Sequence, residues 1–473
     1  MTTEKHVDGR VPEASRELWP PASAAGPKTR IVVVGGGFGG ALLVGHLDKL
    51  FRPRRDVEVL LVSQDNYFLM TPFLFEACTG TLELRHCSVP IRAFLRHARF
   101  LEAAVHRVDL ERRVVHAAGS DRTGYELPYD HLVLAAGSVT NTSRIPGSAN
   151  AFTFKALADA LVLRNHIIER FERAEVEADE ARRRKLLTLV IIGAGLIGME
   201  LVGELTAFVD RIVSYYPHVR RSEVRFVVCE GGDRILPEIV PSLAQYAERV
   251  LRDRPGLEIR TGTRVMAIEP ERVNLAGEVL AAGTIVLSAG VLPNPLVATL
   301  PVEKGRHGAM VVDATMRCPS RPELWALGDC AAIPSPDGKS YPTLAQHALR
   351  EAKTLAKNLH AVHSGRSPRP FVYETRGLMG SLGHKKAFAQ VCGIALRGFF
   401  AWWIRRTYYL LQMPGWARRL HVAIDWTIAL LFRPDIVKVD TAREADLLAR
   451  DAAAGGMPEA HPRALVAHRS HAE

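Results

Sequence analysis

The sequence predicts an α/β protein of two doubly wound domains, one inserted in the other, followed by an amphipathic helical region. An apolar strand that runs straight into a glycine turn occurs twice, at residues 31–40 and 189–198. A segment rich in aromatic residues and arginine lies at residues 396–433. The 473 residues suffice for two or three domains that each bury a core. The repeated strand-and-turn unit favours parallel sheets covered by helices.

The composition is that of a globular protein, because 47% of the residues are hydrophobic and 24% are charged. The formal net charge of +10 is compatible with binding to nucleic acid, with binding to an anionic membrane, or with simple solubility. The distribution of the charge along the chain distinguishes these alternatives. The six cysteines have no metal-binding spacing, which predicts reduced thiols and no metal site. Residues 279–302 are uncharged but are broken by glycine and proline, so we expect no transmembrane segment.

The first glycine turn has the features of a dinucleotide cradle. A strand is expected at Ile31–Val34, and the glycines after it are Gly35, Gly37 and Gly40. In such a Rossmann-like turn the first glycine allows the tight bend, the second lets backbone amides approach a pyrophosphate, and the third lets the helix pack on the strand. The helix N-terminus then faces the phosphates. The next strand ends in Ser63 where a carboxylate is usual, so Ser63 either bonds a ribose without charge or only ends the strand.

The second glycine turn repeats the pattern and adds an acid. Its glycines are Gly193, Gly195 and Gly198, and the next strand ends in Glu230. A carboxylate there accepts hydrogen bonds from ribose hydroxyls and repels a 2′-phosphate, which favours NADH over NADPH. Glu230 follows at more than the usual ~20 residues, so a longer helix and loop are expected. Two cradles predict two dinucleotides, a resident flavin and a diffusing cofactor.

Taken together, the pattern resembles the two-dinucleotide-binding-domain flavoproteins, and within them the type II NADH:quinone oxidoreductases. The motifs that carry the resemblance are Asn66–Leu69 with Thr71-Pro72, Glu76–Gly80, Tyr129–Ser138, Gly232–Pro237, Ala289–Val291 and Leu324–Ala331. The resemblance implies bound FAD, the substrate NADH, and an NADH dehydrogenase that passes electrons to a membrane quinone without pumping protons.

The resemblance also assigns roles to single residues. Asp329 would hydrogen-bond the ribityl chain of the flavin. Glu200 would act catalytically where the nicotinamide meets the flavin, although the helix dipole also favours an acid in a first turn. The other expected flavin contacts are Ala136, Gly137, Gly290, Ala345 and Gln346.

One departure concerns the quinone. The family often carries two glutamines shortly after the Ala-Gln pair, where the quinone head is thought to sit. Here those positions hold Arg350 and Glu351. This departure puts the quinone site in question but not the flavin.

The C-terminal segment Leu396–Arg433 predicts a membrane contact. It holds nine aromatic residues, six arginines and a single acid, Asp425. Residues from Leu420 to Leu431 repeat apolar side chains at helical spacing. Such a helix lies in the membrane surface, with aromatic rings at headgroup level and arginines near anionic lipids. A pair of core helices is the alternative, and no nucleic-acid-binding module is visible.

We therefore expect the following division of the chain. Residues 1–28 form a flexible arm, 29–165 and 283–365 the FAD-binding domain, 186–282 the NADH-binding domain, 366–440 the membrane-contact region, and 441–473 a flexible tail. The expected location is the cytoplasmic face of the cell membrane, as a peripheral protein, and a homodimer is compatible with the sequence.

Two other functions stay open at this point. The first is a soluble NADH-dependent flavoprotein reductase with a small-molecule or protein acceptor, which Arg350 and Glu351 favour and the aromatic C-terminal segment disfavours. The second is a redox-sensing protein that binds FAD and NAD without turnover. Reduction of the flavin by NADH would exclude the second.

Overall fold

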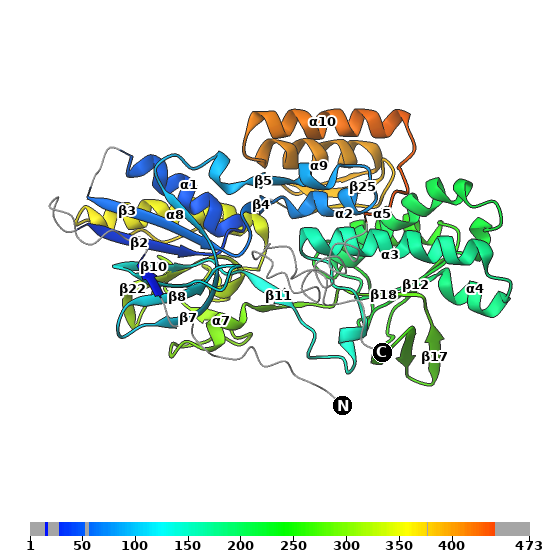
Figure 1. The fold of residues 1–473 in the computed structure, drawn as a ribbon, viewed down its shortest axis with the longest axis horizontal. Helices are drawn as coiled ribbons and strands as arrows, with labels where there is room; N and C mark the ends of the chain where they lie inside the picture. Colours follow the sequence, from blue (N-terminus) through cyan, green and yellow to red (C-terminus); the bar gives the residue numbers. More distant parts are fainter. Residues whose placement is uncertain (1–14, 18–27, 53–55, 376, 440–473) are drawn as a thin grey trace, which may run out of the picture.

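The computed structural model describes residues 15–17, 28–52, 56–375 and 377–439. Two sheets of mainly parallel strands lie side by side, and a C-terminal pair of helices covers one side of the junction (Figure 1). This arrangement confirms the predicted α/β class with two doubly wound domains.

The first sheet has six strands in the order β21-β22-β10-β2-β3-β6. Helices α1 and α8 lie against one of its faces and the sheet that contains β7 and β8 lies on the other (Figure 1). The bounds are β2 (Thr29–Val34), β3 (Val57–Ser63), β6 (Arg99–Glu102), β10 (His131–Leu134), β21 (Arg317–Cys318), β22 (Arg321–Ala326), α1 (Phe38–Leu50) and α8 (Ala345–His363). The covering sheet consists of β1 (Ser15–Glu17), β7 (Ala104–Asp109), β8 (Val114–Ala118) and β9 (Gly124–Pro128). The fully apolar runs of β2, β3 and β10 are buried because both faces of the sheet are covered.

The second sheet has four parallel strands in the order β14-β13-β12-β18. The bounds are β12 (Thr188–Ile192), β13 (Arg225–Cys229), β14 (Leu257–Arg260) and β18 (Thr284–Leu287). Its helices are α3 (Leu157–Val176), α4 (Glu180–Leu186), α5 (Leu196–Ile212) and α6 (Pro241–Arg252). An antiparallel sheet of β15 (Val265–Glu269), β16 (Arg272–Leu275) and β17 (Glu278–Ala281) precedes β18.

Two expected domain boundaries do not coincide with the ends of structural elements. We expected the first domain to resume at residue 283, but β18 is hydrogen-bonded to β12 and belongs to the second sheet. We also expected a boundary at residue 165, but α3 continues through it to Val176. Strands β11 (Ser138–Thr140) and β19 (Val291–Pro293) pair antiparallel, so the two passages of the chain between the domains run together.

The C-terminal region combines strand and helix. Strands β24 (Met379–Ser381), β25 (Ala387–Val391) and β26 (Ile394–Arg397) precede α9 (Gly398–Gln412) and α10 (Trp416–Leu431). Helix α9 packs on β25, and α10 lies outermost (Figure 1). Smaller elements near this region are β4 (Tyr67–Leu69), α2 (Leu74–Cys78) and β5 (Ser88–Pro90), while α7 (Pro295–Ala298), β20 (Met310–Val311) and β23 (Ala331–Ala332) follow the second passage between the domains.

Both expected flexible ends fall largely outside the described residues. Within the expected arm, residues 15–17 form β1, which pairs in parallel with β9. The expected tail, 441–473, lies wholly outside the described residues. Among the described residues, no helix combines the length and apolarity that crossing a membrane requires.

Candidate functional site

A cavity of about 2700 Å³ lies between the two domains. The first glycine turn lines it, as do the start of α5 and side chains of α9. Pockets for drug-sized ligands hold roughly 300–1,000 Å³, so this cavity has room for a dinucleotide and a second ligand. The structure thus brings the first predicted cradle, the helix that follows the second cradle, and the C-terminal helix α9 to one cavity.

The first cradle is shaped by close backbone contacts. A side chain at Gly40 would place its Cβ 1.9 Å from the carbonyl oxygen of Gly35, and Gly35 itself has φ +109°. At Gly37 no atom lies within 4 Å of where a Cβ would be, so the turn is open to the cavity. Ser63 ends β3, is buried, and lines the cavity. The tight turn, the open face and the N-terminus of α1 fit the pyrophosphate of an FAD.

The second cradle has the same backbone shape, and two backbone hydrogen bonds fix the position of Glu230. A Cβ at Gly198 would lie 2.0 Å from the carbonyl oxygen of Gly193. The carboxylate of Glu230 accepts hydrogen bonds from the backbone N–H of Ala194 (2.7 Å) and of Gly232 (2.7 Å). Glu230 is therefore fixed against the glycine turn. Of the described residues near this turn, Leu196, Ile197 and Glu200 line the cavity, whereas Gly193, Gly195, Gly198 and Glu230 do not.

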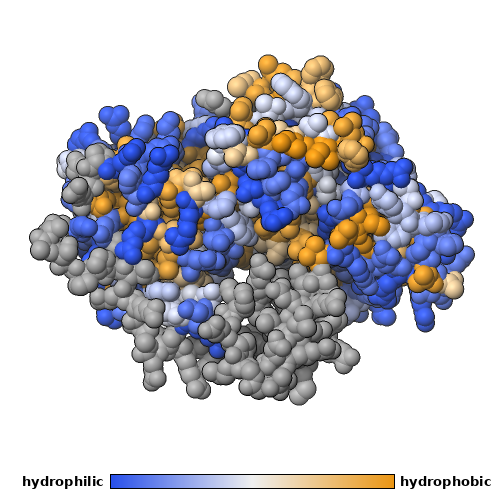
Figure 2. Space-filling view, turned by 45° about the horizontal axis from the view of Figure 1, so that its top comes forward, coloured by the Kyte–Doolittle hydropathy of each residue, from blue (hydrophilic) through white to orange (hydrophobic). Residues whose placement is uncertain are grey.

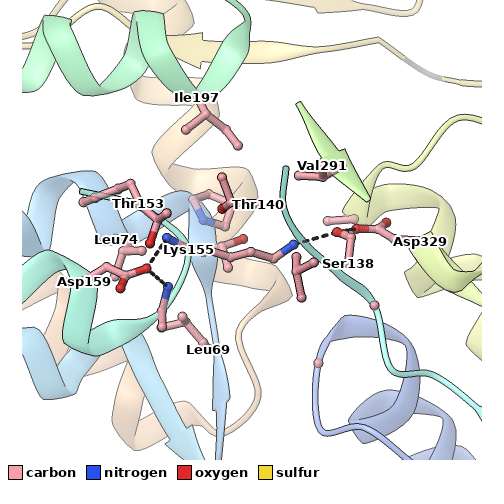
Figure 3. A pocket seen from close by; sticks show the side chains of 18 of the residues that line it. Leu69, Leu74, Ser138, Thr140, Thr153, Lys155, Asp159, Ile197, Val291 and Asp329 are labelled. Carbon is pink, nitrogen blue, oxygen red and sulfur yellow. Dashed lines mark hydrogen bonds between the residues drawn. The ribbon is translucent and has the colours of Figure 1, made fainter. Parts of the chain in front are cut away.

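Asp329 takes part in a chain of hydrogen bonds that sequence reasoning did not foresee. Lys155 Nζ donates to Ser138 Oγ (2.6 Å), and Ser138 Oγ donates to Asp329 Oδ2 (2.5 Å). Figure 3 shows Lys155 reaching across the pocket toward Ser138 and Asp329. Burial lowers the pKa of Lys155, and the negative charge of Asp329 opposes that shift. Ser138 adjoins the expected Gly137, but nothing in the sequence singled out Lys155.

The remaining expected flavin contacts also line the cavity. Gly137 and Gly290 both have positive φ, and no atom lies within 4 Å of where their Cβ atoms would be. Helix α8 begins at Ala345 in the cavity wall. Gln346 is held by two bonds, donating to the Gly377 carbonyl (2.9 Å) and accepting from Tyr373 (3.2 Å). Ala136 lines the same wall.

Glu200 lines the cavity but is anchored in a buried ion pair. Its Oε1 lies 2.7 Å from Arg405 Nη2 of α9 and accepts a hydrogen bond from the Ser381 backbone N–H (2.8 Å). Burial raises the pKa of Glu200, and the positive charge of Arg405 opposes the rise. Glu204, one turn further along α5, accepts from Ser381 Oγ (2.6 Å), and burial with the charge of Glu76 raises its pKa.

Two arginines of the C-terminal segment are not where we expected them. Arg405 and Arg406 are buried and face Glu76 of α2, at 3.5 Å and 3.1 Å, rather than a lipid surface. Arg406 is sandwiched between the rings of Trp402 (4.1 Å) and Trp426 (4.6 Å). The sequence did not reveal Glu76 as the partner of these arginines. A charged side chain is buried only where another segment supplies the opposite charge, and α2 supplies it here.

The two residues that depart from the family pattern do different things. Arg350 lines the cavity and lies over the ring of Tyr373 (5.3 Å). Glu351 is buried, and its Oε2 accepts the backbone N–H of Gly328 (2.7 Å), next to Asp329. Burial raises the pKa of Glu351 to about 7, although the Gly328 bond opposes the rise. Only Arg350 therefore faces the space where an acceptor could sit.

The outer surface of α9 and α10 is apolar. Figure 2 shows hydrophobic side chains gathered over these helices. The expected repeat on α10 points outward, with Leu420, Ile424 and Ile428 each about half exposed (52%, 46% and 50%). Further exposed apolar residues of this surface are Phe399, Phe400, Trp403, Leu411, Trp416, Leu430, Leu431 and Phe432. An apolar surface of this extent marks an interaction site.

Comparisons with known proteins agree with this architecture. The model of the family described as pyridine nucleotide-disulphide oxidoreductase matches residues 29–352. A relative named probable NADH dehydrogenase, from Dictyostelium discoideum, is 30% identical, over 86% of this chain and 90% of the relative. The type II NADH:quinone oxidoreductase Ndh of Mycobacterium tuberculosis is 29% identical, over 85% of this chain and 88% of its own length.

A solved structure shares the fold. NDH2 from Plasmodium falciparum, in complex with NADH, superposes with a TM-score of 0.80 at 21% identity, and the match covers 87% of this chain and all of that chain (100%).

The fold and the two cradles define a flavoprotein oxidoreductase of the two-dinucleotide class. The chain belongs to the pyridine nucleotide-disulphide oxidoreductase family, and within it to the type II NADH:quinone oxidoreductases. Membership confirms the expected enzyme class, with FAD and NADH as its dinucleotides and quinone as the acceptor.

Proposed function

We propose that this chain oxidises NADH at an FAD held in the interdomain cavity and passes both electrons to a quinone. The quinone would come from a membrane that the outer face of α9 and α10 contacts. The observation that carries the proposal is the single cavity lined by the first glycine turn, the start of α5 and the aromatic residues of α9. A cofactor, a hydride donor and an apolar acceptor would meet in this one cavity.

Residues of the first domain would hold the FAD. The turn from Gly35 to Gly40 would bind its pyrophosphate, Asp329 its ribityl chain, and the N-terminus of α8 would lie beside its ring. When bound, FAD supplies the two-electron chemistry that accepts a hydride from NADH and later reduces the acceptor. The chain's own residues supply orientation and exclusion of water.

Residues of the second domain would hold the NADH. Gly193–Gly198 would bind its pyrophosphate and Glu230 its ribose, with the nicotinamide directed past Ile197 into the cavity. Glu200 lines the cavity at that point, held by Arg405. We assign it the catalytic position where nicotinamide and flavin meet.

The quinone would enter along α9. Ile404, Tyr408, Tyr409 and Gln412 line the cavity from that helix. Their apolar and aromatic surfaces suit a quinone ring. Arg350 replaces a neutral residue of the family pattern, and its guanidinium would favour an acceptor that gains negative charge on reduction.

The exposed apolar surface of α9 and α10 would rest in the interfacial region of the membrane. Four arginines of the segment are free of the buried cluster, namely Arg397, Arg418, Arg419 and Arg433. They would lie near anionic headgroups, and a cytoplasmic-face, peripheral location would follow. With quinone taken from the membrane and no spanning helix among the described residues, electron transfer would not be coupled to proton pumping.

The test compares acceptors. NADH oxidation is measured with a short-chain quinone in solution, with a long-chain quinone in phosphatidylglycerol vesicles, and with ferricyanide. We expect activity with all three, and vesicles should raise the rate with the long-chain quinone. Turnover with ferricyanide but with neither quinone would contradict the proposal and favour a soluble reductase with another acceptor.

A further inference from the structure

Lys155 extends from the loop before α3 to the flavin side of the cavity. Its backbone N–H donates to Asp159 Oδ2 (2.8 Å), which also caps the start of α3, so the base of the side chain is fixed. Its Nζ donates to Ser138 Oγ (2.6 Å), and Ser138 in turn donates to Asp329 (2.5 Å). Figure 3 shows these groups in a row across the pocket, with Ile197 of α5 above them in this view. Lys155 thus lines the cavity together with the first glycine turn and with Ile197 at the start of α5.

Lys155 differs from the other basic residues that line the cavity. Arg170 is paired with Glu271 (3.1 Å), Lys438 with Glu169, and Arg350 lies over Tyr373. Among the described residues, no carboxylate forms an ion pair with Lys155. An ammonium group has three donors, and a single hydrogen bond, to Ser138, is formed by Nζ with the described residues. Two of its donors are therefore available to a ligand, and the negative charge of Asp329 acts on the ammonium across the intervening Ser138.

Hydride transfer creates a need for such a charge. A hydride carries two electrons and one proton. When it moves, the C4–H bond of the dihydronicotinamide breaks, an N–H bond forms on the flavin, the nicotinamide becomes cationic NAD⁺, and the flavin ring system gains one negative charge. A fixed cation in a cavity with little water stabilises that charge far more than it would in solution.

We propose that Lys155 stabilises the negative charge that the flavin acquires from NADH, and that Ser138 and Asp329 hold its ammonium in place. The N-terminus of α8 offers about half a positive charge to the same ring, so Lys155 strengthens an existing preference rather than creating it. The proposal rests on the proposed function in that FAD and NADH must react in this cavity.

The test uses the FAD-loaded full chain with Lys155 replaced by Met or by Arg. We expect K155M to bind FAD, to have a more negative flavin midpoint potential in spectroelectrochemical titration, and to be reduced by NADH about ten- to a hundredfold more slowly in stopped flow. K155R keeps the charge and should retain a potential close to that of the wild type. K438M removes a cavity-lining lysine that is paired with Glu169, and it should leave the potential unchanged.

Each outcome of these measurements either supports or refutes the proposed role of Lys155. An unchanged potential in K155M, or equal shifts in K155M and K155R, would overturn the proposal and leave Lys155 a structural role. If K155M came out without flavin, S138A would replace it, because that variant keeps the charge but frees the ammonium. A smaller negative shift in S138A would support the proposal, and no shift would refute it. A wild-type flavin that NADH does not reduce would instead refute the proposed function, whatever the potentials.

Discussion

The role of a single glutamate in this protein depends on which backbone N–H groups its carboxylate accepts hydrogen bonds from. Glu230 and Glu351 are both acids near glycine-rich turns, but Glu230 closes the second cradle through two backbone N–H groups. Glu351 supports the loop that carries Asp329. Two glutamates in similar sequence surroundings therefore have different roles: Glu230 is a proposed substrate contact, and Glu351 supports a neighbouring loop.

Replacing Glu230 should change the choice of dinucleotide. Glu230→Ala removes the acceptor for the ribose hydroxyls and the charge that repels a 2′-phosphate. We expect kcat/KM for NADH to fall about ten- to a hundredfold and the ratio of NADPH to NADH use to rise. Glu238→Gln is the matched control, because its carboxylate lies beside Gly195 of the same turn. Steady-state kinetics that show the same dinucleotide preference in Glu230→Ala as in the wild type would remove the ribose assignment.

Glu351 predicts a pH-dependent stability. Burial raises its pKa to about 7 in the folded chain, well above the 4.5 that is usual for a glutamate, so the folded state keeps a proton that the unfolded chain releases. Stability should therefore fall as pH rises from about 4.5 to 7, by up to about 3 kcal/mol, and stay reduced above pH 7.

The variant that tests this is Glu351→Gln, which can still accept the Gly328 bond without charge. Its melting temperature should be close to that of the wild type at pH 5 and higher at pH 8. Glu374→Gln, which removes a carboxylate from the exposed surface, controls for the loss of one charge. A constant difference between Glu351→Gln and the wild type across this range would refute the assignment.

Among the elements, α10 shows how one helix can satisfy two environments. Its inner side places Trp426 Nε1 on Glu76 (2.6 Å) and buries Val422, and its outer side exposes Leu420, Ile424 and Ile428. The helix begins after Gly415, whose φ of +82° lets the chain reverse from α9. Both helices therefore contribute one face to the protein and leave an apolar face uncovered.

The uncovered face of α10 should bind lipid. In the triple variant L420S/I424S/I428S we expect the affinity for phosphatidylglycerol vesicles, measured by co-sedimentation, to fall at least about tenfold, because less apolar surface is buried in the interface. NADH oxidation with ferricyanide should be unaffected. Val279→Ser on β17, which removes an exposed apolar side chain far from α10, should bind vesicles like the wild type (Figure 1). Undiminished binding of the triple variant would mean that the membrane contact lies elsewhere.

At the scale of the whole molecule, the C-terminal helices are tied to segments that lie far away in the chain. Arg405 and Arg406 of α9 both reach Glu76 of α2, and Arg405 also reaches Glu200 of α5. Removing one partner of a buried ion pair costs about 3–5 kcal/mol, because the other charge stays buried without compensation. Region 398–431 is therefore part of the folded body as well as a surface for a membrane.

Truncation should reveal this double role. A chain that ends at Arg397 loses both arginines and Trp426, and leaves Glu76 and Glu200 without their partners. We expect a clearly lower melting temperature and lost NADH oxidation with every acceptor, not only reduced vesicle binding. Arg405→Met in the full chain should reproduce much of the destabilisation while keeping the apolar face. A truncated chain as stable as the wild type would show that the buried pairs contribute little.

The sequence by itself determined the local features of this protein: the two glycine cradles, the acid after the second, and the amphipathic repeat of α10. Local backbone shape depends on neighbouring residues, so Gly35 and Gly40, or Gly193 and Gly198, carry their geometry in their spacing. The expected boundary at 283 misses β18 because strand pairing, which composition does not show, decides sheet membership, and the expected boundary at 165 falls inside α3.

Only the tertiary structure decided which charges are buried and which groups meet in the cavity. Glu76 and Arg405 are 329 positions apart in the chain, and Ser138 and Asp329 are 191 apart. An arginine-rich segment looks the same whether its side chains face lipid or a buried carboxylate, because the cost of burying a charge depends on a partner that lies far away in the sequence. For the same reason Lys155 acquires a role only once Ser138 and Asp329 are folded against it.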